Sequence, residues 1–363
     1  MNVIGRFVRS IILGVNIFFM LLLFFSAFSP YIDPEKYPVL SCAGLAFPVF
    51  LVLNLCFLIF WLLVYRRYVW FPIVAFLICI CQIRTYLPIN FHIKEVPESS
   101  IKLLSYNVMA FGGNTKPTAN NPNPILEYIR KSDADIICMQ EFIMGPNKRH
   151  IQKSDVDKIL KAYPYSSYHH IGSGSNGLAC YSKYPILSSK KMDYKSMYNG
   201  SVVYKILIDG DTVTVMNNHL ESNKLTYEDK ATYVDMIKDP EKSKVSQGAR
   251  LLINKLAEAS QIRAGQAKYI SGRISANPHK TIIVCGDFND SPISYSHRLI
   301  SETLKDAFVE SGRGLGISYN QNGFYFRIDN ILISDNLKSY NCTVDRSIRN
   351  SDHYPIWCYL EIK

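Results

Sequence analysis

The chain has 363 residues, of which 48% are hydrophobic and 19% are charged, and its formal net charge is +10 at pH 7. This length is enough for two domains that each hold a substantial core. Five of the nine cysteines lie beyond residue 91, an odd number that excludes a complete disulfide set there, and no CxxC pair indicates a zinc site. Residues 1–91 contain 6 Lys and Arg against 2 Asp and Glu, whereas residues 92–363 contain 34 against 28.

The first 91 residues have the composition of a membrane anchor. A spanning helix needs about 20 mostly apolar residues. Three segments meet this requirement, with Arg84 close enough to the end of the last one for its side chain to reach the interface. We therefore expect three transmembrane helices, at about 11–28, 40–64 and 69–87. The alternative is that these segments are buried helices of a globular core.

Basic residues predict the orientation of this anchor. Arg6 and Arg9 precede the first span, and Arg66 and Arg67 separate the second from the third. The positive-inside rule places both groups in the cytoplasm, so the chain emerges outside after the third span. We expect an integral protein of the inner or plasma membrane whose residues 92–363 are extracytoplasmic, and periplasmic in a Gram-negative source. The first segment also fits a cleaved signal peptide, which would leave that side unchanged.

Residues 92–363 show alternating strand and helix patterns. Strands are expected at 101–108, 135–141, 176–186, 201–210, 211–220, 281–290, 326–334 and 352–362, and helices at 123–133, 155–164 and 247–274. Asp209-Gly210-Asp211 predicts a hairpin turn between two of these strands. Strands interspersed with helices indicate an α/β fold with a mixed sheet covered by helices.

Polar side chains stand repeatedly at the ends of the apolar strands. They are Asn107, Glu141, His219, Asp287 with Asn289, Asp329, and Asp352 with His353. If the extended backbone continues, Asp287 and Asn289 point to the same face. Strand ends that meet in one cleft are where α/β proteins build sites. Carboxylates, amides and imidazoles together suit a hard divalent cation with general acid and base groups.

These residues carry a resemblance to a known family. The pieces "LLSYNV", "DIICMQE", "GLACYSKYPI", "NNHLES", "IRAGQAKYI", "VCGDFNDSP", "RIDNILIS" and "SDHYPI" occur in this order over residues 99–363. Together they resemble the endonuclease/exonuclease/phosphatase superfamily with the deoxyribonuclease-I-like fold. The resemblance implies a four-layer α/β sandwich of two mixed sheets flanked by helices in residues 92–363, a catalytic domain that follows the three spans.

The resemblance also implies a role for each strand-end residue. Glu141 resembles the metal-binding glutamate, and Asn107 and Asp352 resemble its companions at the metal. His219 and His353 resemble the histidines that contact the phosphate, with Asp329 paired to His353. Asp287 resembles the aspartate that orients or deprotonates the attacking water, and Asn289 the amide that holds a phosphoryl oxygen. The implied cofactor is Mg²⁺, or Mn²⁺.

Each residue has an ordinary structural alternative. Glu141 could cap a following helix, Asp287 and Asn289 could form an Asx turn, and Asp329 could pair with Arg327. Arg263 and Gln266 are interpreted as surface residues of a helix. Asn330 and Tyr181 depart from the residues common in the family, and the charged insertion at 222–245 is expected to overhang the cleft.

The sequence thus predicts a membrane-tethered, metal-dependent hydrolase of phosphate esters, with a phosphodiesterase or nuclease type of activity. The substrate would be a nucleic acid or a lipid headgroup, and no obligate protein partner is evident. Residues 92–363 have a net charge of +6, which is compatible with nucleic acid binding. Their sequence lacks the dense stripe of Lys and Arg that is typical of a nucleic-acid-binding surface. The alternatives are a sphingomyelinase-like or phosphoinositide-phosphatase-like enzyme, or an inactive binding module on the same fold.

Overall fold

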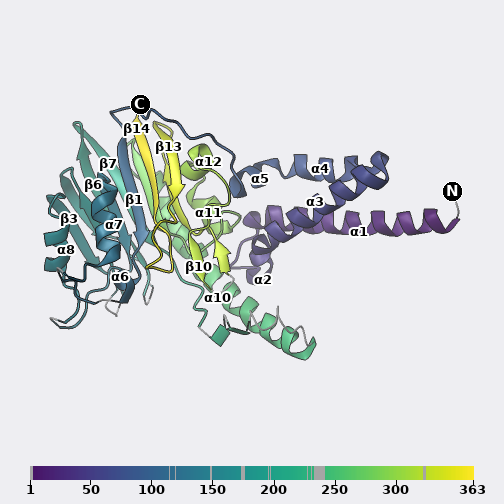
Figure 1. Cartoon of the computed structure of the whole chain (residues 1–363), viewed down its shortest axis with the longest axis horizontal. Coiled ribbons are helices and arrows are strands. Elements are labelled where there is room, and N and C mark those ends of the chain that lie inside the picture. Colours follow the sequence, from purple (N-terminus) through teal and green to yellow (C-terminus); the bar gives the residue numbers. More distant parts are fainter. Residues whose placement is uncertain are drawn as a thin grey trace.

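Two mixed β-sheets form the centre of the molecule. The computed structural model describes residues 3–113, 115–118, 120–147, 149–172, 176–194, 196, 198–226, 228, 229, 231, 232, 242–321 and 324–363. The first sheet has the order β13-β14-β1-β2-β4-β3 and the second the order β5-β6-β7-β8-β12-β9. Figure 1 shows the sheets with helices around them and the N-terminal helices extending away on one side.

The strands of the first sheet are β1 (Ile101–Asn107), β2 (Ile136–Gln140), β3 (Tyr165–His170), β4 (Gly177–Ser182), β13 (Leu337–Val344) and β14 (Ile356–Ile362). Those of the second are β5 (Ile186–Lys191), β6 (Gly200–Ile208), β7 (Asp211–His219), β8 (Ile282–Asp287), β9 (Lys305–Asp306) and β12 (Asp329–Ile333). A separate hairpin pairs β10 (Tyr319–Gln321) with β11 (Phe324–Phe326).

Each sheet contains one parallel pair among antiparallel neighbours. β1 runs parallel to β2, and β7 runs parallel to β8. The other strand pairs, including the β6–β7 hairpin that turns at Asp209 and Gly210, are antiparallel. The prediction of mixed sheets is therefore confirmed, and so is the hairpin predicted from the Asp-Gly turn.

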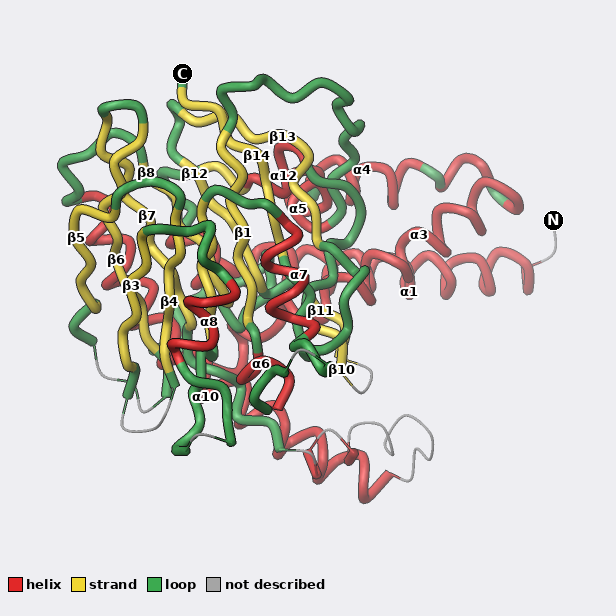
Figure 2. The backbone as a smooth tube through the Cα atoms, turned by 60° about the vertical axis from the view of Figure 1, so that its left-hand side comes forward, coloured by secondary structure: helices red, strands yellow, loops and turns green. Residues whose placement is uncertain are grey.

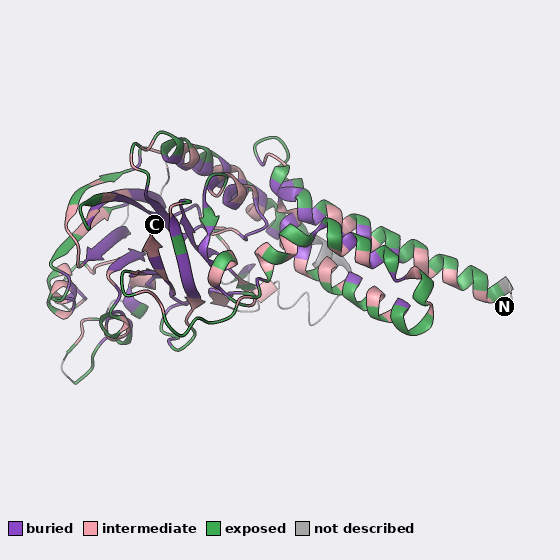
Figure 3. Ribbon diagram, turned by 90° about the horizontal axis from the view of Figure 1, so that it is seen from above, coloured by how far each residue is buried: buried purple, intermediate pink, exposed green. Residues whose placement is uncertain are grey.

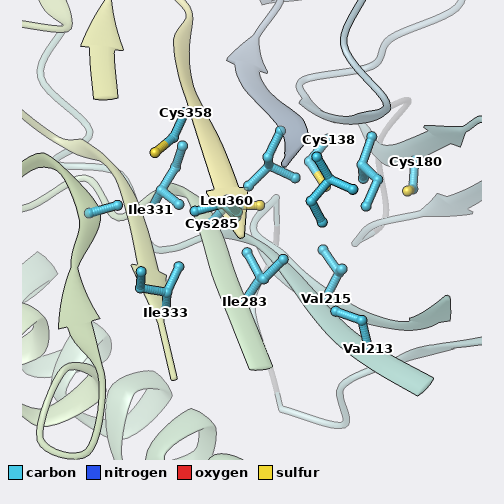
Figure 4. Packing of buried hydrophobic residues seen from close by; sticks show 14 of the residues in the cluster. Cys138, Cys180, Val213, Val215, Ile283, Cys285, Ile331, Ile333, Cys358 and Leu360 are labelled. Carbon is cyan, nitrogen blue, oxygen red and sulfur yellow. The ribbon is translucent and has the colours of Figure 1, made fainter. Parts of the chain in front are cut away.

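The two sheets pack face to face through apolar side chains. Fully buried residues of the second sheet are Ile283 and Cys285 of β8, Val215 of β7 and Ile331 of β12. They pack against the first sheet, to which Cys138 of β2 belongs. Figure 4 shows these side chains interdigitating between the strands. All five cysteines beyond residue 91 are buried and free, and they fill the core as small apolar residues.

Helices cover the outer faces of both sheets. On the first sheet lie α7 (Pro124–Ser132) and α8 (Lys153–Ile159), and α6 (Met109–Gly113) follows β1 (Figure 2). On the second lie α10 (Lys242–Ser275) and α11 (Tyr295–Ile300), while α12 (Ala307–Ser311) packs beside β13. The sequence explains the start of α7, because the Asn123 side chain accepts hydrogen bonds from the backbone N–H groups of Ile125 and Leu126.

Two N-terminal helical stretches are long and apolar enough to cross a membrane. They are Ile4–Tyr31 and Pro38–Val64. The first is α1 (Val3–Phe28) with a short 3₁₀ turn, and the second joins α2 (Pro38–Ser41), the 3₁₀ helix η2 (Cys42–Ala46) and α3 (Phe47–Val64). Figure 3 shows that most residues of these helices are exposed or half-buried, whereas the sheets are buried. The first two predicted spans therefore correspond to apolar helices of sufficient length.

The third predicted span is not one straight helix. Arg66–Ile78 and Ile80–Tyr86 are bent by 65° at Cys79, so the described chain has two clear candidate spans and a third only if the bent pair crosses as one. The second helix of the pair, α5 (Ile80–Tyr86), follows α4 (Trp70–Ile78) and turns back to the sheets. There Arg327 donates a hydrogen bond of 2.8 Å to the carbonyl oxygen of Thr85. Docking onto the folded domain thus competes with a straight span.

Replacing Ile283 by Ala should lower the free energy of unfolding by about 3 kcal/mol, because it leaves a cavity between two rigid sheets. Ile283 is fully buried at the centre of this layer. The measurement is thermal or denaturant unfolding of the full chain in lipid nanodiscs. Leu187→Ala is the matched control, since the Leu187 side chain is 54% exposed on β5 and its loss should change stability by less than about 0.5 kcal/mol. Equal effects of the two substitutions would contradict the assignment of the core.

Candidate functional site

Strand register brings the predicted site residues together. His219 lies opposite Asp287 in the parallel pair β7–β8, and Asp329 lies opposite Asp287 in the antiparallel pair β8–β12. Asn107 ends β1 next to the end of β2, and Glu141 follows β2 directly. Five of the predicted residues are thus placed by hydrogen-bonded strands of two sheets whose ends meet.

A glycine lets the backbone pack closely at this point. Gly286 has a φ of +123°, and a Cβ atom there would collide with the backbone of Asn218 in β7. Any other residue would push β8 away from β7 and would separate Asp287 from His219. The glycine before the aspartate therefore contributes to the site although it has no side chain.

The Asp287 carboxylate lies at the centre of the site, and its residue is only 1% exposed. Its Oδ2 atom is 3.6 Å from Nε2 of His219 and 3.6 Å from Nε2 of His353. The same oxygen accepts a hydrogen bond of 3.1 Å from the Asn107 amide. Burial raises the pKa of Asp287 to about 6, although the two histidines oppose the increase.

Asn289 does not continue the strand as the sequence analysis expected. β8 ends at Asp287, and Asn289 has a φ of +52°. The backbone N–H of Asn289 donates to Oδ1 of Asp287 at 2.8 Å, so the two residues form the Asx turn considered as an alternative. The Asn289 side chain donates one N–H to the Leu220 carbonyl oxygen at 2.9 Å and still lines the cavity, with a second amide N–H available.

The two histidines have opposite electrostatic environments. His353 Nδ1 is 2.8 Å from Oδ2 of Asp329, which is fully buried. Burial alone would lower the pKa of His353, but the charges of Asp329 and Asp287 outweigh it and raise the pKa to about 10. Burial lowers the pKa of His219 instead. One ring is therefore an imidazolium at neutral pH and the other is neutral.

Asp329 pairs with His353 and not with Arg327. The Arg327 guanidinium instead donates to Oδ2 of Asp306 at 2.8 Å. The Arg327 alternative for Asp329 is therefore wrong. The helix-capping alternative for Glu141 also fails, because β2 leads into a loop and not into a helix.

Glu141 faces the cavity with an Asp352 carboxylate nearby. The Glu141 side chain is 30% exposed, its Oε1 atom is 3.7 Å from Nε2 of His219, and it accepts a hydrogen bond of 3.3 Å from Asn107. Burial raises the pKa of Glu141, and the negative charge of Asp352 adds to the increase against the opposing charge of His353. A cation would relieve this repulsion, and carboxylate oxygens are the ligands that Mg²⁺ prefers.

The Asn107 side chain donates hydrogen bonds to the carboxylates of the site. Its amide N–H groups point to Glu141 and Asp287, and its Oδ1 atom accepts from the backbone N–H of Met109 at 3.2 Å. Asn107 thus orients the carboxylates in this structure. Asp287, Asp329 and His353 form a second group whose ligand atoms lie within 4.8 Å of one another. Within that group, His353 and Asp329 form a short hydrogen bond, and the Asp287 carboxylate lies beside this pair.

One cavity exposes most of these groups. Six of the eight predicted residues line it. The other two do not line it but are hydrogen-bonded to residues that do, Asn107 to Asp287 and Asp329 to His353. The cavity is also lined by residues that the sequence analysis did not assign to the site, including Ser41, Cys42, Leu45, Arg263, Tyr319, Phe324 and Phe326.

Arg263 was wrongly interpreted as a surface residue. It is 3% exposed and lies in the cavity wall, where its Nε is 3.2 Å from Oδ2 of Asp290. Gln266, one turn further along α10, accepts from the backbone N–H of Glu221 at 2.9 Å. The signal in the sequence was the alanine pair Ala264 and Ala267 beside them, which marks a tightly packed helix face.

Comparison with known proteins identifies the family of the chain. The profile of the Endonuclease/Exonuclease/phosphatase family matches residues 104–353, which is most of the chain. The chain belongs to this family. Residues 9–86 match a second profile, described as a domain of unknown function (DUF8431). No curated protein sequence matches the chain closely enough to count as a relative.

A solved structure shares the fold of this family member. D. rerio TDP2 humanized by 14 mutations superposes with a TM-score of 0.50 at 14% identity, covering 73% of this chain and 100% of that chain. An endonuclease/exonuclease/phosphatase family protein from Leptotrichia buccalis has a TM-score of 0.48 at 19% identity, covering 72% and 100% of the two chains. The human Nocturnin catalytic domain has a TM-score of 0.47 at 15% identity, with coverages of 74% and 96%. At these identities the likeness concerns the fold alone.

The imidazole of His353 should stay protonated to about pH 10 in the metal-free family member, because the Asp329 carboxylate stabilises its charge. Asp329→Asn removes that charge and should lower the pKa of His353 by at least ~1 unit. The measurement is ¹⁵N NMR of histidine-labelled, chelator-treated protein in nanodiscs between pH 5 and 11. His219 provides the internal control, since it should remain neutral at pH 7 in both proteins. An unchanged His353 titration in Asp329→Asn would contradict the pairing.

Proposed function

We propose that the chain is a divalent-metal-dependent phosphodiesterase of the endonuclease/exonuclease/phosphatase family, tethered to a membrane through residues 1–91. The observation that carries this proposal is the Asp287 carboxylate, held in a cavity between a neutral and a charged imidazole. Family members act as hydrolases of phosphate esters, and the fold supports that activity class here. An inactive binding module would not need two histidines in opposite charge states around one buried acid.

In this proposal Asp287 prepares the nucleophile. A water molecule within reach of the carboxylate would be oriented by one oxygen while the other is held by the Asn289 N–H. With a pKa of about 6, Asp287 is still mostly ionised at neutral pH and is a stronger base than an ordinary aspartate. Proton transfer to Asp287 then accompanies the attack of the water oxygen on phosphorus.

The histidines and the amide would bind the phosphoryl group. His353, held in one orientation by Asp329, presents a charged Nε2–H to a phosphoryl oxygen. His219 offers a neutral N–H, and Asn289 offers its remaining amide N–H. Charge on the transferring group increases toward the transition state, so donors fixed in a buried site stabilise that state more than the substrate.

Glu141 and Asp352 would hold the metal, with Asn107 orienting Glu141. A Mg²⁺ or Mn²⁺ ion bound there would neutralise charge on the phosphoryl oxygens. Two carboxylates leave most of the coordination sphere to water and substrate, which suits Mg²⁺.

Asp287→Asn should lower kcat for bis-p-nitrophenyl phosphate by about 10²- to 10⁴-fold, because the amide cannot accept the proton of the attacking water. The measurement is steady-state hydrolysis by the full chain in nanodiscs with Mg²⁺ or Mn²⁺, and a chelator should abolish the wild-type rate. Asp335→Asn is the matched control, since Asp335 is 84% exposed beyond the far end of β12. Wild-type rates in Asp287→Asn would refute the role of Asp287.

We also propose that residues 92–363 lie outside the cytoplasm. An engineered cysteine at position 187, which is exposed on β5, should react in intact cells with a maleimide that cannot cross membranes. The wild-type chain, treated in parallel, gives the background of the native cysteines. Labelling of Leu187→Cys above that background only after lysis would place the domain on the cytoplasmic side.

A further inference from the structure

The cavity that contains the predicted catalytic residues has one wall made by the N-terminal segment. Ser41, Cys42 and Leu45, which lie near the start of the second candidate span, line the same cavity as Asp287 and His353. These residues are more than 240 positions away from Asp287 in the sequence. The site is therefore closed on one side by the membrane-anchor segment itself.

Specific contacts fix this wall against the folded domain. The hydroxyl of Ser41 is 3.3 Å from that of Ser260 in α10. At Gly44 the chain approaches the Ile293 carbonyl oxygen so closely that a Cβ atom would collide with it. Ile293 also packs into one apolar cluster with α1, α3 and α4. The wall is thus a built part of the site and not a loosely apposed loop.

Seven apolar side chains of the described chain line the cavity beyond the acids and imidazoles, interspersed with polar residues such as Ser222, Asn223 and Ser260. Its apolar lining residues come from η2, α10, the β10–β11 hairpin and neighbouring loops, and they are Leu45, Leu225, Leu256, Ile293, Phe324, Phe326 and Ile328. A substrate that ended at a phosphate or a small polar alcohol would leave this surface without a partner. An apolar chain attached to the phosphate would cover it and gain its transfer free energy from water.

Within the part of the chain that the structure describes, the charge around the cavity does not fit a nucleic acid strand. Among the described residues that line it, the cationic side chains of Lys and Arg are Lys224 and Arg263. Lys224 is 3.0 Å from Glu221, and Arg263 is 3.2 Å from Asp290. A strand-binding groove combines aromatic residues with a basic track along the backbone, and that track is lacking in this wall.

The cavity lies on the membrane side of the sheets. α10 and the β10–β11 hairpin, which line it, stand on the side from which α1 and α3 extend (Figure 1). These two elements also carry exposed apolar side chains, namely Leu251 and Ile253 on α10 and Tyr325 on the hairpin. The cavity thus has one wall at the start of a candidate spanning helix and exposed apolar residues on adjoining elements, an arrangement that would suit a cavity facing lipid.

We propose that the substrate is a membrane phospholipid, whose phosphodiester enters between His219 and His353 while its acyl chains lie along the wall formed by Leu45 and Leu256. This inference rests on the proposed phosphodiesterase function and adds the substrate class. Hydrolysis bonds the water oxygen to phosphorus and breaks one P–O ester bond. The departing alcohol oxygen gains a proton as the water loses one, so no electrons are exchanged and no co-reactant is needed.

A comparison of matched diesters tests the proposal. The full chain in nanodiscs, with Mg²⁺ or Mn²⁺, is assayed on glycerophosphocholine, on dihexanoyl phosphatidylcholine below its micelle concentration, and on a single-stranded DNA oligonucleotide. The same series is repeated with the ethanolamine and glycerol headgroups. We expect kcat/KM for the best dihexanoyl lipid to exceed that of its deacylated counterpart by at least about tenfold, since two short chains bury apolar surface in the cavity. Both compounds are soluble, so tethering to a bilayer cannot produce the difference.

Substitutions in the wall locate the effect. Leu45→Ser and Leu256→Ser should each lower the ratio of the two kcat/KM values several-fold, because each replaces an apolar side chain of the wall with a polar one. Leu187→Ser is the matched control on exposed β5 and should leave the ratio unchanged. The wild-type comparison does not depend on these variants, so it remains decisive even if a substitution disturbs folding.

Two results would overturn the inference in distinguishable ways. If the chain hydrolyses bis-p-nitrophenyl phosphate but prefers the deacylated diesters or the oligonucleotide, the lipid assignment is wrong and the phosphodiesterase function stands. If it hydrolyses neither the bis-nitrophenyl ester nor any natural diester with either metal, both proposals fail. A preference for the acylated diester that is unaffected by both wall substitutions would refute the placement of the chains.

Discussion

Burial of one negative charge governs the organisation of the catalytic end of this molecule. Asp287 is almost inaccessible at the end of a core strand, and an uncompensated carboxylate there would cost several kcal/mol. The surrounding groups offset that cost: an amide from Asn107, the backbone N–H of Asn289, and two imidazole rings. Each of these groups is supplied by a different strand end or loop. The folding of both sheets is therefore needed before the carboxylate is tolerated.

The second acid, Asp329, determines which histidine carries a charge. It holds His353 through a short hydrogen bond, whereas His219 has only distant carboxylates, and its Nδ1 has no hydrogen-bond partner among the described residues. Two rings of the same chemical type therefore differ in charge at neutral pH. Strand pairing sets this difference, because the β8–β12 register places Asp329 beside Asp287.

Much of this site is encoded in short sequence patterns. Apolar runs that end in Asn107, Glu141, His219 and Asp287 identified strands whose ends converge. The strand and helix pattern predicted a mixed sheet, and the family resemblance implied the two sheets that the structure has. The direction of the Asn289 side chain was not predictable in this way. The left-handed turn at Asn289 arises from a hydrogen bond to Asp287, and alternation along a strand says nothing about it.

Contacts between distant segments were also beyond sequence reasoning. Nothing near Arg263 in the sequence reveals that its guanidinium meets Asp290, and nothing near Leu45 reveals that it faces a catalytic cavity. The bend of 65° at Cys79 was likewise not predicted from the hydropathy of the segment that contains it. A hydropathy pattern gives the length and composition of an apolar segment, and it does not predict which residues the end of a helix contacts.

The side chain of Arg327 has a consequence for the independence of the two parts. Arg327 lies two residues before Asp329, the acid that charges His353. Its buried guanidinium donates hydrogen bonds to Asp306 inside the domain and to the Thr85 carbonyl oxygen of the N-terminal segment. Proteolytic release of residues 92–363 would leave that guanidinium one acceptor short, uncover Ile293 and open the cavity on one side. The N-terminal segment and residues 92–363 are in this respect a single folding unit, because contacts at Thr85 and Ile293 join them.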